Sequence, residues 1–126
     1  MEINDPATVR ELEALYPQYE KALMENDVEM LTRMFWKSPH AMRFGVQENL
    51  YGSEEIDDFR RERPSAGLER KIMQMDVVTF GKDYGSVTLE FERRVHGKPV
   101  YGRQSQVWVR FDEGWRIVAA HVSLLP

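Results

Sequence analysis

The chain has 126 residues, enough for one domain spanning residues 1–126, and its 42% hydrophobic and 30% charged residues are typical of a soluble globule. A net charge of −4 argues against a nucleic-acid or membrane partner, because such surfaces need a basic stripe. The absence of cysteine excludes disulfides, cysteine–zinc sites and thiol catalysis. The first residues are acidic and polar and no apolar run reaches the ~20 residues of a membrane span, so we expect a soluble, cytoplasmic protein.

The first helix is predicted to start at Asp5 and Pro6, a capping side chain followed by a proline in the first turn. Apolar residues then recur at spacings of three and four: Val9, Leu12, Tyr16, Tyr19 and Leu23. Pro17 interrupts this stripe and is expected to kink or unwind the helix near Glu13 to Tyr16.

Two shorter helices are predicted next, with a short extended segment between them. Asn26 and Asp27 end the first helix and cap a second one, whose buried face is Met30, Leu31, Met34 and Phe35. Ser38 and Pro39 then turn the chain into an extended segment around Arg43. The third helix is expected from Ser53 until Pro64 terminates it.

Strand patterns fill the rest of the chain, at about 68–80, 86–95, 100–111 and 115–124. The turn sequences GKDYG, HGKP and DEG separate them. Three helices followed by a four-stranded antiparallel meander indicate an α+β fold.

The last hairpin predicts a pocket face. If residues 112–114 form a three-residue loop, Phe111 faces Trp115 and the register continues to the far end of the hairpin. The further pairs are Val109 with Ile117, Val107 with Ala119, Ser105 with His121, and Arg103 with Ser123. This face is apolar near the turn and polar at the other end, as expected of a ligand pocket. The opposite face would meet a partner subunit through Gln104, Gln106, Trp108, Arg110, Arg116, Val118 and Val122.

Arg43 stands between Met42 and Phe44, in a segment that should enter the core. A buried guanidinium needs a partner, because an unpaired charge in an apolar interior is very costly. One interpretation is a structural ion pair with Glu48 or Asp27. The other is a fork for a ligand carboxylate, since guanidinium matches carboxylate in a bidentate manner.

Tyr19 lies on the apolar stripe, so its hydroxyl needs a partner inside the protein. It is either a core tyrosine bonded to a backbone carbonyl or, beside Arg43, a proton donor or acceptor with a lowered pKa. Trp36 would close a pocket mouth or pack in the core, and His121 would line the pocket or be structural. The three histidines are far apart and show no metal-binding spacing, so no metal site is expected.

The order of elements and the ending WRIVAAHVS resemble the NTF2-like (SnoaL-like, cystatin-like) superfamily, in which three helices pack on a curved, mostly antiparallel sheet to form a cone. A closer resemblance, to the AtzH-like family associated with oxalurate catabolism, covers nearly the whole chain. Its motifs are EINDPATV, YEKALMENDVEML, FWKSPHAMRFGVQENLYG, GRQSQVWVRF and GWRIVAAHVSLL. Pro17 departs from the pattern expected of the first helix.

The resemblance implies a cofactor-free hydrolase that breaks amides with decarboxylation, acting on small carboxylated ureas or ureido acids of the oxalurate or 1,3-dicarboxyurea type. It implies Tyr19 and Arg43 as the catalytic pair. Trp36, Arg103, Ser105 and His121 are the expected substrate-binding residues. This hypothesis requires an Arg43 guanidinium that no acid of the protein neutralises and that lies within reach of Tyr19.

Two other functions stay open. A non-catalytic homodimer could hold a metabolite or act as an accessory subunit for an amidase partner. A cofactor-free isomerase of ketones is a weaker alternative, because the predicted pocket face offers no acidic base.

Overall fold

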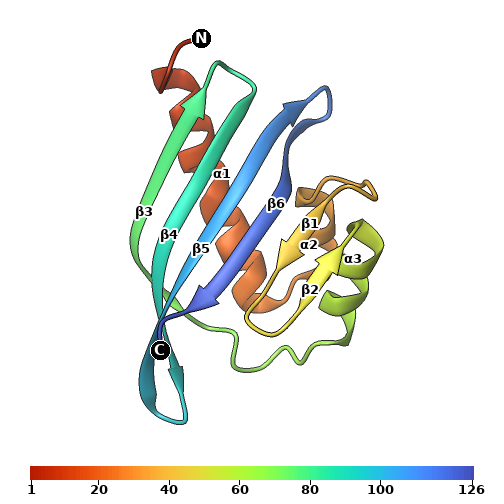
Figure 1. Cartoon of the computed structure of the whole chain (residues 1–126), viewed down its shortest axis with the longest axis vertical. Coiled ribbons are helices and arrows are strands. Elements are labelled where there is room, and N and C mark those ends of the chain that lie inside the picture. Colours follow the sequence, from red (N-terminus) through yellow and green to blue (C-terminus); the bar gives the residue numbers. More distant parts are fainter.

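The computed structural model describes all residues 1–126 and shows three helices packed on one face of a six-stranded sheet (Figure 1). The helices are α1 (Pro6–Glu25), α2 (Val28–Met34) and α3 (Ser53–Glu62). The strands are β1 (Met42–Phe44), β2 (Asn49–Tyr51), β3 (Lys71–Phe80), β4 (Tyr84–Val95), β5 (Lys98–Phe111) and β6 (Gly114–Leu124). The predicted α+β class is confirmed.

The sheet has the order β2-β1-β6-β5-β4-β3, and all its pairs are antiparallel except β1 with β6. The predicted meander is therefore extended at one edge by a small β1–β2 hairpin. The extended segment around Arg43 is β1 itself, and Arg43 pairs in register with Ala120 of β6 and Leu50 of β2. The parallel pairing places this arginine beside the last strand of the chain.

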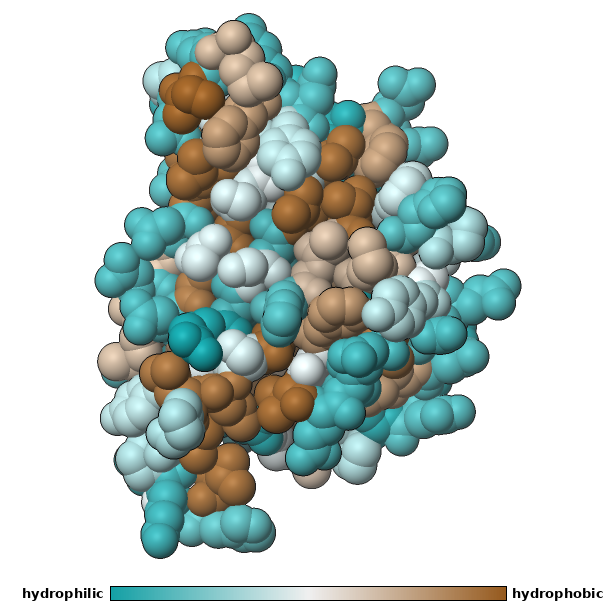
Figure 2. Space-filling model, viewed as in Figure 1, coloured by the Kyte–Doolittle hydropathy of each residue, from teal (hydrophilic) through white to brown (hydrophobic).

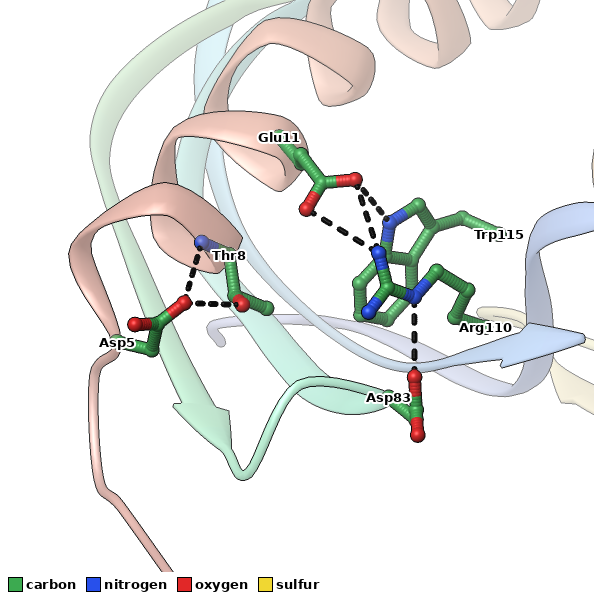
Figure 3. A network of polar contacts seen from close by, with 6 residues as sticks. All are labelled: Asp5, Thr8, Glu11, Asp83, Arg110 and Trp115. Atoms are coloured by element: carbon green, nitrogen blue, oxygen red, sulfur yellow. Dashed lines mark hydrogen bonds and ion pairs between the residues drawn. The ribbon is translucent and has the colours of Figure 1, made fainter.

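Helix α1 begins where the sequence predicts. The Asp5 carboxylate accepts hydrogen bonds from the Thr8 amide at 3.1 Å and from the Thr8 hydroxyl at 2.7 Å, which lower the pKa of Asp5 (Figure 3). The expected unwinding near Pro17 is wrong, because the helix continues without interruption through this residue. Pro17 lies on the exposed side, so its ring leaves the buried stripe intact. None of the three helices has the length and apolar content of a membrane-spanning segment.

Arg110 connects α1 to the sheet (Figure 3). Its guanidinium bonds Asp83 at 3.0 Å and Glu11 at 3.3 Å, and Glu11 also accepts a hydrogen bond from the Trp115 indole at 3.4 Å. Because Asp83 lies before β4 and Glu11 on α1, this network fixes the N-terminal half of α1 over the β5–β6 turn.

The β5–β6 register differs from the prediction in its first half. The turn has two residues rather than three, so Phe111 pairs with Gly114 and Arg110 with Trp115. The expected pairs of Phe111 with Trp115 and of Val109 with Ile117 are therefore wrong. A β-bulge at Val118 then restores the register, and the predicted pairs of Val107, Ser105 and Arg103 with residues of β6 are confirmed.

The pocket face was assigned to the wrong side of the sheet. Trp108 is fully buried against the helices, and Gln104 and Gln106 flank it on the same face. Gln106 accepts a hydrogen bond from the Trp108 indole at 3.0 Å, so these polar side chains are partly satisfied inside the core. Gln104, Gln106 and Trp108, expected to face a partner subunit, thus point to the interior, whereas Arg103, Ser105, Val107 and His121, expected to line the pocket, lie on the outer face of the sheet. Trp115 and Ile117 were also expected on the pocket face, but they are buried in the interior beside Trp108.

Candidate active site

A cleft of about 410 Å³ opens between the C-terminal end of α1, helix α3, the β1–β2 hairpin and strands β4 to β6. Half of its 16 lining residues are hydrophobic, including Leu23, Phe59, Phe91, Val122 and Leu124. The polar lining comes mainly from Arg43, Glu48, Arg63, Arg70 and Gln104. An apolar cleft with a few charged groups is the usual form of a small-molecule site.

Arg43 points into this cleft and is 5% exposed, so the expectation that it enters the interior is confirmed. The expectation that no acid of the protein neutralises it is wrong, because its Nη1 lies 3.0 Å from Oε2 of Glu48. Glu48 is one of the two partners that the sequence suggested. The turn between β1 and β2 brings Glu48 back beside Arg43, and it is closed by a hydrogen bond from the Gly45 amide to the Glu48 carbonyl at 2.9 Å. A Cβ at Gly45 would collide with the Glu48 carboxylate.

The Arg43–Glu48 pair uses only part of the guanidinium. Nη1 donates to Glu48, while Nε and Nη2 bond no group of the chain and are not fully enclosed. The guanidinium also lies 5.4 Å from the centre of the Phe59 ring. The unpaired Arg43 cation on which the sequence-based hypothesis depended is therefore not present, because Glu48 offsets part of its charge. What Arg43 still offers to a ligand in the cleft is the pair of donors Nε and Nη2.

Tyr19 lies behind the cleft and is 1% exposed. Its hydroxyl oxygen accepts a hydrogen bond from Nη2 of Arg60 at 2.9 Å, and its own proton is donated to no group of the chain. The direct partner is therefore neither the backbone carbonyl nor Arg43, the two possibilities that the sequence suggested. Burial raises the pKa of Tyr19, but the charges of Arg60 and Arg43 and the Arg60 hydrogen bond together outweigh burial and lower it.

Arg60 is the functional candidate that sequence reasoning missed. It is fully buried, and its Nε and Nη1 have no hydrogen-bond partner. Its guanidinium lies against the rings of Tyr19 and Phe35, at 5.8 and 5.4 Å from their centres. The sequence pattern that could have indicated its burial is the spacing of four residues from Ile56, because this spacing places both residues on the buried face of α3.

Arg63 completes a guanidinium cluster with Arg43 and Arg60. Its Nε donates to Asn26 at 3.2 Å, and its Nη2 is buried without a partner. Burial, followed by the charges of Arg60 and Arg43, lowers the pKa of Arg63 to about 10. Within this cluster the carboxylate in direct contact is that of Glu48, so the region has an excess of positive charge.

Arg70 is fully compensated by contrast. Its Nε and Nη2 each lie 2.8 Å from an oxygen of Glu20, and Nη2 also donates to Gln104 at 2.8 Å. Tyr16 donates to Glu20 at 2.8 Å, and burial together with the Glu20 charge raises the pKa of Tyr16. This network is a rigid side of the cleft, and Tyr16 is held neutral there.

The remaining expected binding residues lie elsewhere. Arg103, Ser105 and His121 are exposed on the outer face of the sheet, so the expectation that they line the pocket is wrong. Trp36 stacks on Phe111 with ring centres 5.6 Å apart and does not line the cleft. The structure therefore places Arg43 in the cleft and Tyr19 outside its lining, where the Arg43 charge still acts on the phenol, and it separates both from the other four. No group of three or more histidine, aspartate or glutamate side chains is arranged to hold a metal ion.

Comparisons with known proteins agree with this architecture. A family model described as AtzH-like matches residues 1–126. The structure of a DUF3225-family protein of unknown function from Pectobacterium atrosepticum is 46% identical, with a TM-score of 0.93 over 98% of this chain and 95% of that one. A cystatin-like fold protein from Burkholderia xenovorans is 40% identical, with a TM-score of 0.91 over 100% and 99% of the two chains.

More distant structures share the fold alone. An NTF2-like superfamily protein from Salmonella enterica is 20% identical, with a TM-score of 0.79 over 95% of this chain and 92% of that one. No curated protein matches the chain. The predicted NTF2-like, cystatin-like fold is confirmed by these similarities.

Proposed function

Because the chain belongs to the AtzH-like family, we propose that it is a cofactor-free enzyme that decarboxylates and hydrolyses a small carboxylated urea or ureido acid, of the oxalurate or 1,3-dicarboxyurea type. The observation that carries this proposal is the guanidinium cluster, which has three cations and one contacting carboxylate beside a buried phenol. A small anion would complete the balance of charge in the cleft. Cationic ligands fit these surroundings poorly.

The proposed reaction uses Arg43 for binding and Tyr19 for proton transfer. A substrate carboxylate takes donors of Arg43 that Glu48 leaves unused. In an N-carboxylated urea such as 1,3-dicarboxyurea, the bond between nitrogen and the carboxyl carbon breaks, its electron pair stays on nitrogen, and Tyr19 supplies a proton to that nitrogen as carbon dioxide leaves. Hydration of the carbon dioxide by water makes the net change a hydrolysis of this bond. Solvent then returns a proton to Tyr19. A single positioned acid is sufficient for a carbamate-like bond, because protonation of nitrogen makes it a good leaving group.

Two substitutions test this reaction. Arg43→Lys keeps the charge but loses the planar fork, and Tyr19→Phe removes only the hydroxyl. Tyr19→Phe should lower the rate of substrate consumption by about 100-fold or more, the usual contribution of a positioned acid. Arg43→Lys should lower it as well, because the substrate carboxylate is no longer held by a fork. Arg61→Lys is the matched control, because Arg61 is exposed on α3. If both variants of the pair turn over 1,3-dicarboxyurea at the wild-type rate, the mechanism is excluded.

The Arg43–Glu48 ion pair favours a second candidate, a non-catalytic binding or accessory subunit. In this case the cleft holds the same anion without changing it, or the chain docks on an amidase. Calorimetric binding of 1,3-dicarboxyurea by the wild-type protein with no release of carbon dioxide would support this alternative. Co-purification of an amidase would identify the accessory role.

A further inference from the structure

Arg60 has an unusual environment for a charged side chain. It is enclosed where α3 meets α1 and the end of α2, with no exposed surface and no carboxylate in contact. Removing a guanidinium from water without an acidic partner is strongly unfavourable, even after the surroundings relax. A methionine of similar length would fill this space without that cost. Packing alone therefore does not explain why a charged side chain occupies this position.

The groups around Tyr19 explain where this charge acts. Arg60 of α3 donates to the phenol oxygen, and Arg43 of β1 and Arg70, just before β3, add further positive charge. On α1 itself the ring faces Tyr16, which is held neutral, and the nearby Glu20 is engaged by Arg70. The side chain of Phe35 completes the surroundings and carries no charge.

We propose that Arg60 is a positioning residue for Tyr19: its guanidinium fixes the phenol oxygen as a hydrogen-bond acceptor and supplies the charge that makes this phenol an effective proton donor. Because the oxygen accepts from Nη2, the hydroxyl proton must point away from Arg60. Positive charge beside the oxygen stabilises the phenolate left after proton transfer, and the enclosed site strengthens this effect. The lowered pKa of Tyr19 agrees with the geometry.

The role of Tyr19 as a proton donor rests on the proposed function, but the effect of Arg60 on the ionisation of Tyr19 can be tested without substrate. The absorbance of tyrosinate in the near ultraviolet, titrated in the wild type and in Tyr19→Phe, isolates Tyr19 by difference. We expect Tyr19 to ionise below the pH of about 10 at which tyrosine in a model peptide ionises. Ionisation of Tyr19 at or above that pH would overturn the proposal.

Substitution of Arg60 tests the cause. Arg60→Met should move the Tyr19 titration up by about one pH unit or more, since an adjacent opposite charge typically contributes 1–3 units. Arg61→Met removes a guanidinium from the exposed side of the same helix and should leave the titration unchanged. If Arg60→Met titrates like the wild type, the proposal is wrong. If that variant fails to fold, Arg60→Lys, which keeps a charge but loses the fork, should produce a smaller upward shift.

The rate profile provides a second readout. A proton donor must be protonated, so turnover should fall as pH rises through the pKa of Tyr19. In Arg60→Met this fall should move to higher pH and the maximal rate should drop, because the phenol becomes a weaker acid. An unshifted alkaline fall would contradict the role of Arg60. If Arg60→Met loses all turnover but shows the expected absorbance shift, the role of Arg60 is supported. If the wild type itself shows no turnover, that result counts against the proposed function alone.

Discussion

Glu48 determines how much of the Arg43 guanidinium is left for a ligand. Its side chain is more exposed than that of Arg43, at 23% against 6%, so the carboxylate can leave for solvent while the guanidinium cannot. A ligand carboxylate would therefore compete with Glu48 for Arg43. This competition makes the strength of ligand binding depend on a residue that itself need not touch the ligand.

Glu48→Gln removes the competing charge and should strengthen oxalurate binding about fivefold, since a partly exposed ion pair contributes about 1 kcal/mol. Calorimetry in the Tyr19→Phe background measures binding without turnover. Glu54→Gln, at an exposed position on α3, is the control for loss of one negative charge. Weaker binding by Glu48→Gln would instead show that Glu48 orients Arg43 for the ligand.

The sequence predicted the site only where a charge stood among apolar residues. Arg43 is noticeable because Met42 and Phe44 flank it, and Glu48 is near enough in sequence to be considered. Arg60 lies among charged residues of α3, where its burial follows from a helical face shared with Ile56 and from packing against Tyr19, 41 residues away. Such a contact depends on how helices meet, and local patterns do not contain this information.

At the scale of elements, the β5–β6 hairpin shows how two local features can cancel. A turn shorter by one residue shifts the register, and the bulge at Val118 shifts it back. Side chains alternate along a strand, so the wrong turn length misplaced only the residues of β6 between the turn and the bulge, such as Trp115 and Ile117. The pairs of Ser105 with His121 and of Arg103 with Ser123 were predictable, whereas the face they occupy was decided by Trp108.

Helix α1 tolerates Pro17 because the proline faces solvent. A proline inside a helix loses the hydrogen bond to the carbonyl four residues earlier and costs about 3 kcal/mol, of which reduced freedom in the unfolded chain returns about 1. Pro17→Ala should therefore raise the free energy of unfolding by about 2 kcal/mol, as measured with urea. The Tyr19 titration should not change, because the buried stripe is preserved. A less stable variant would mean that the proline sets a bend that the core requires.

At the scale of the whole molecule, the order of helices and strands predicted the fold, but the β1–β2 hairpin was only partly visible. Three-residue strands lack a clear alternation, and parallel pairing of β1 with β6 joins segments about 77 residues apart in the chain. The cleft forms where this hairpin, α3 and the sheet converge. The residues that line the cleft could thus be predicted only after the topology was known.

The outer face of the sheet is the remaining unpartnered surface. Figure 2 shows brown and pale side chains on this face with teal ones among them, and the helix passes behind the strands in the same view (Figure 1). Val107 and Val109 lie centrally on it, and Met42 and Tyr84 are each 43% exposed. A patch of this kind usually marks an interface.

We propose that a second copy of the chain covers this face, because its charges are self-complementary. Two rows cross the sheet in register, Asp76–Thr88–Ser105–His121 and Gln74–Glu90–Arg103–Ser123. The acidic groups lie toward β3 and the basic groups toward β6. A two-fold axis through the centre would bring the acidic side of one copy against the basic side of the other.

Val107→Arg places a charge at the centre of this face and should convert the dimer into a monomer. Light scattering after gel filtration should give twice the chain mass of 14.8 kDa for the wild type and a single chain mass for the variant. Ala14→Arg, on the exposed side of α1, introduces the same charge away from the sheet and should remain dimeric. A wild type with the mass of one chain, or a dimeric Val107→Arg, would exclude the proposed interface. Because the cleft opens on the helical side, the monomeric variant should still bind oxalurate, which separates assembly from the chemistry of Arg43 and Tyr19.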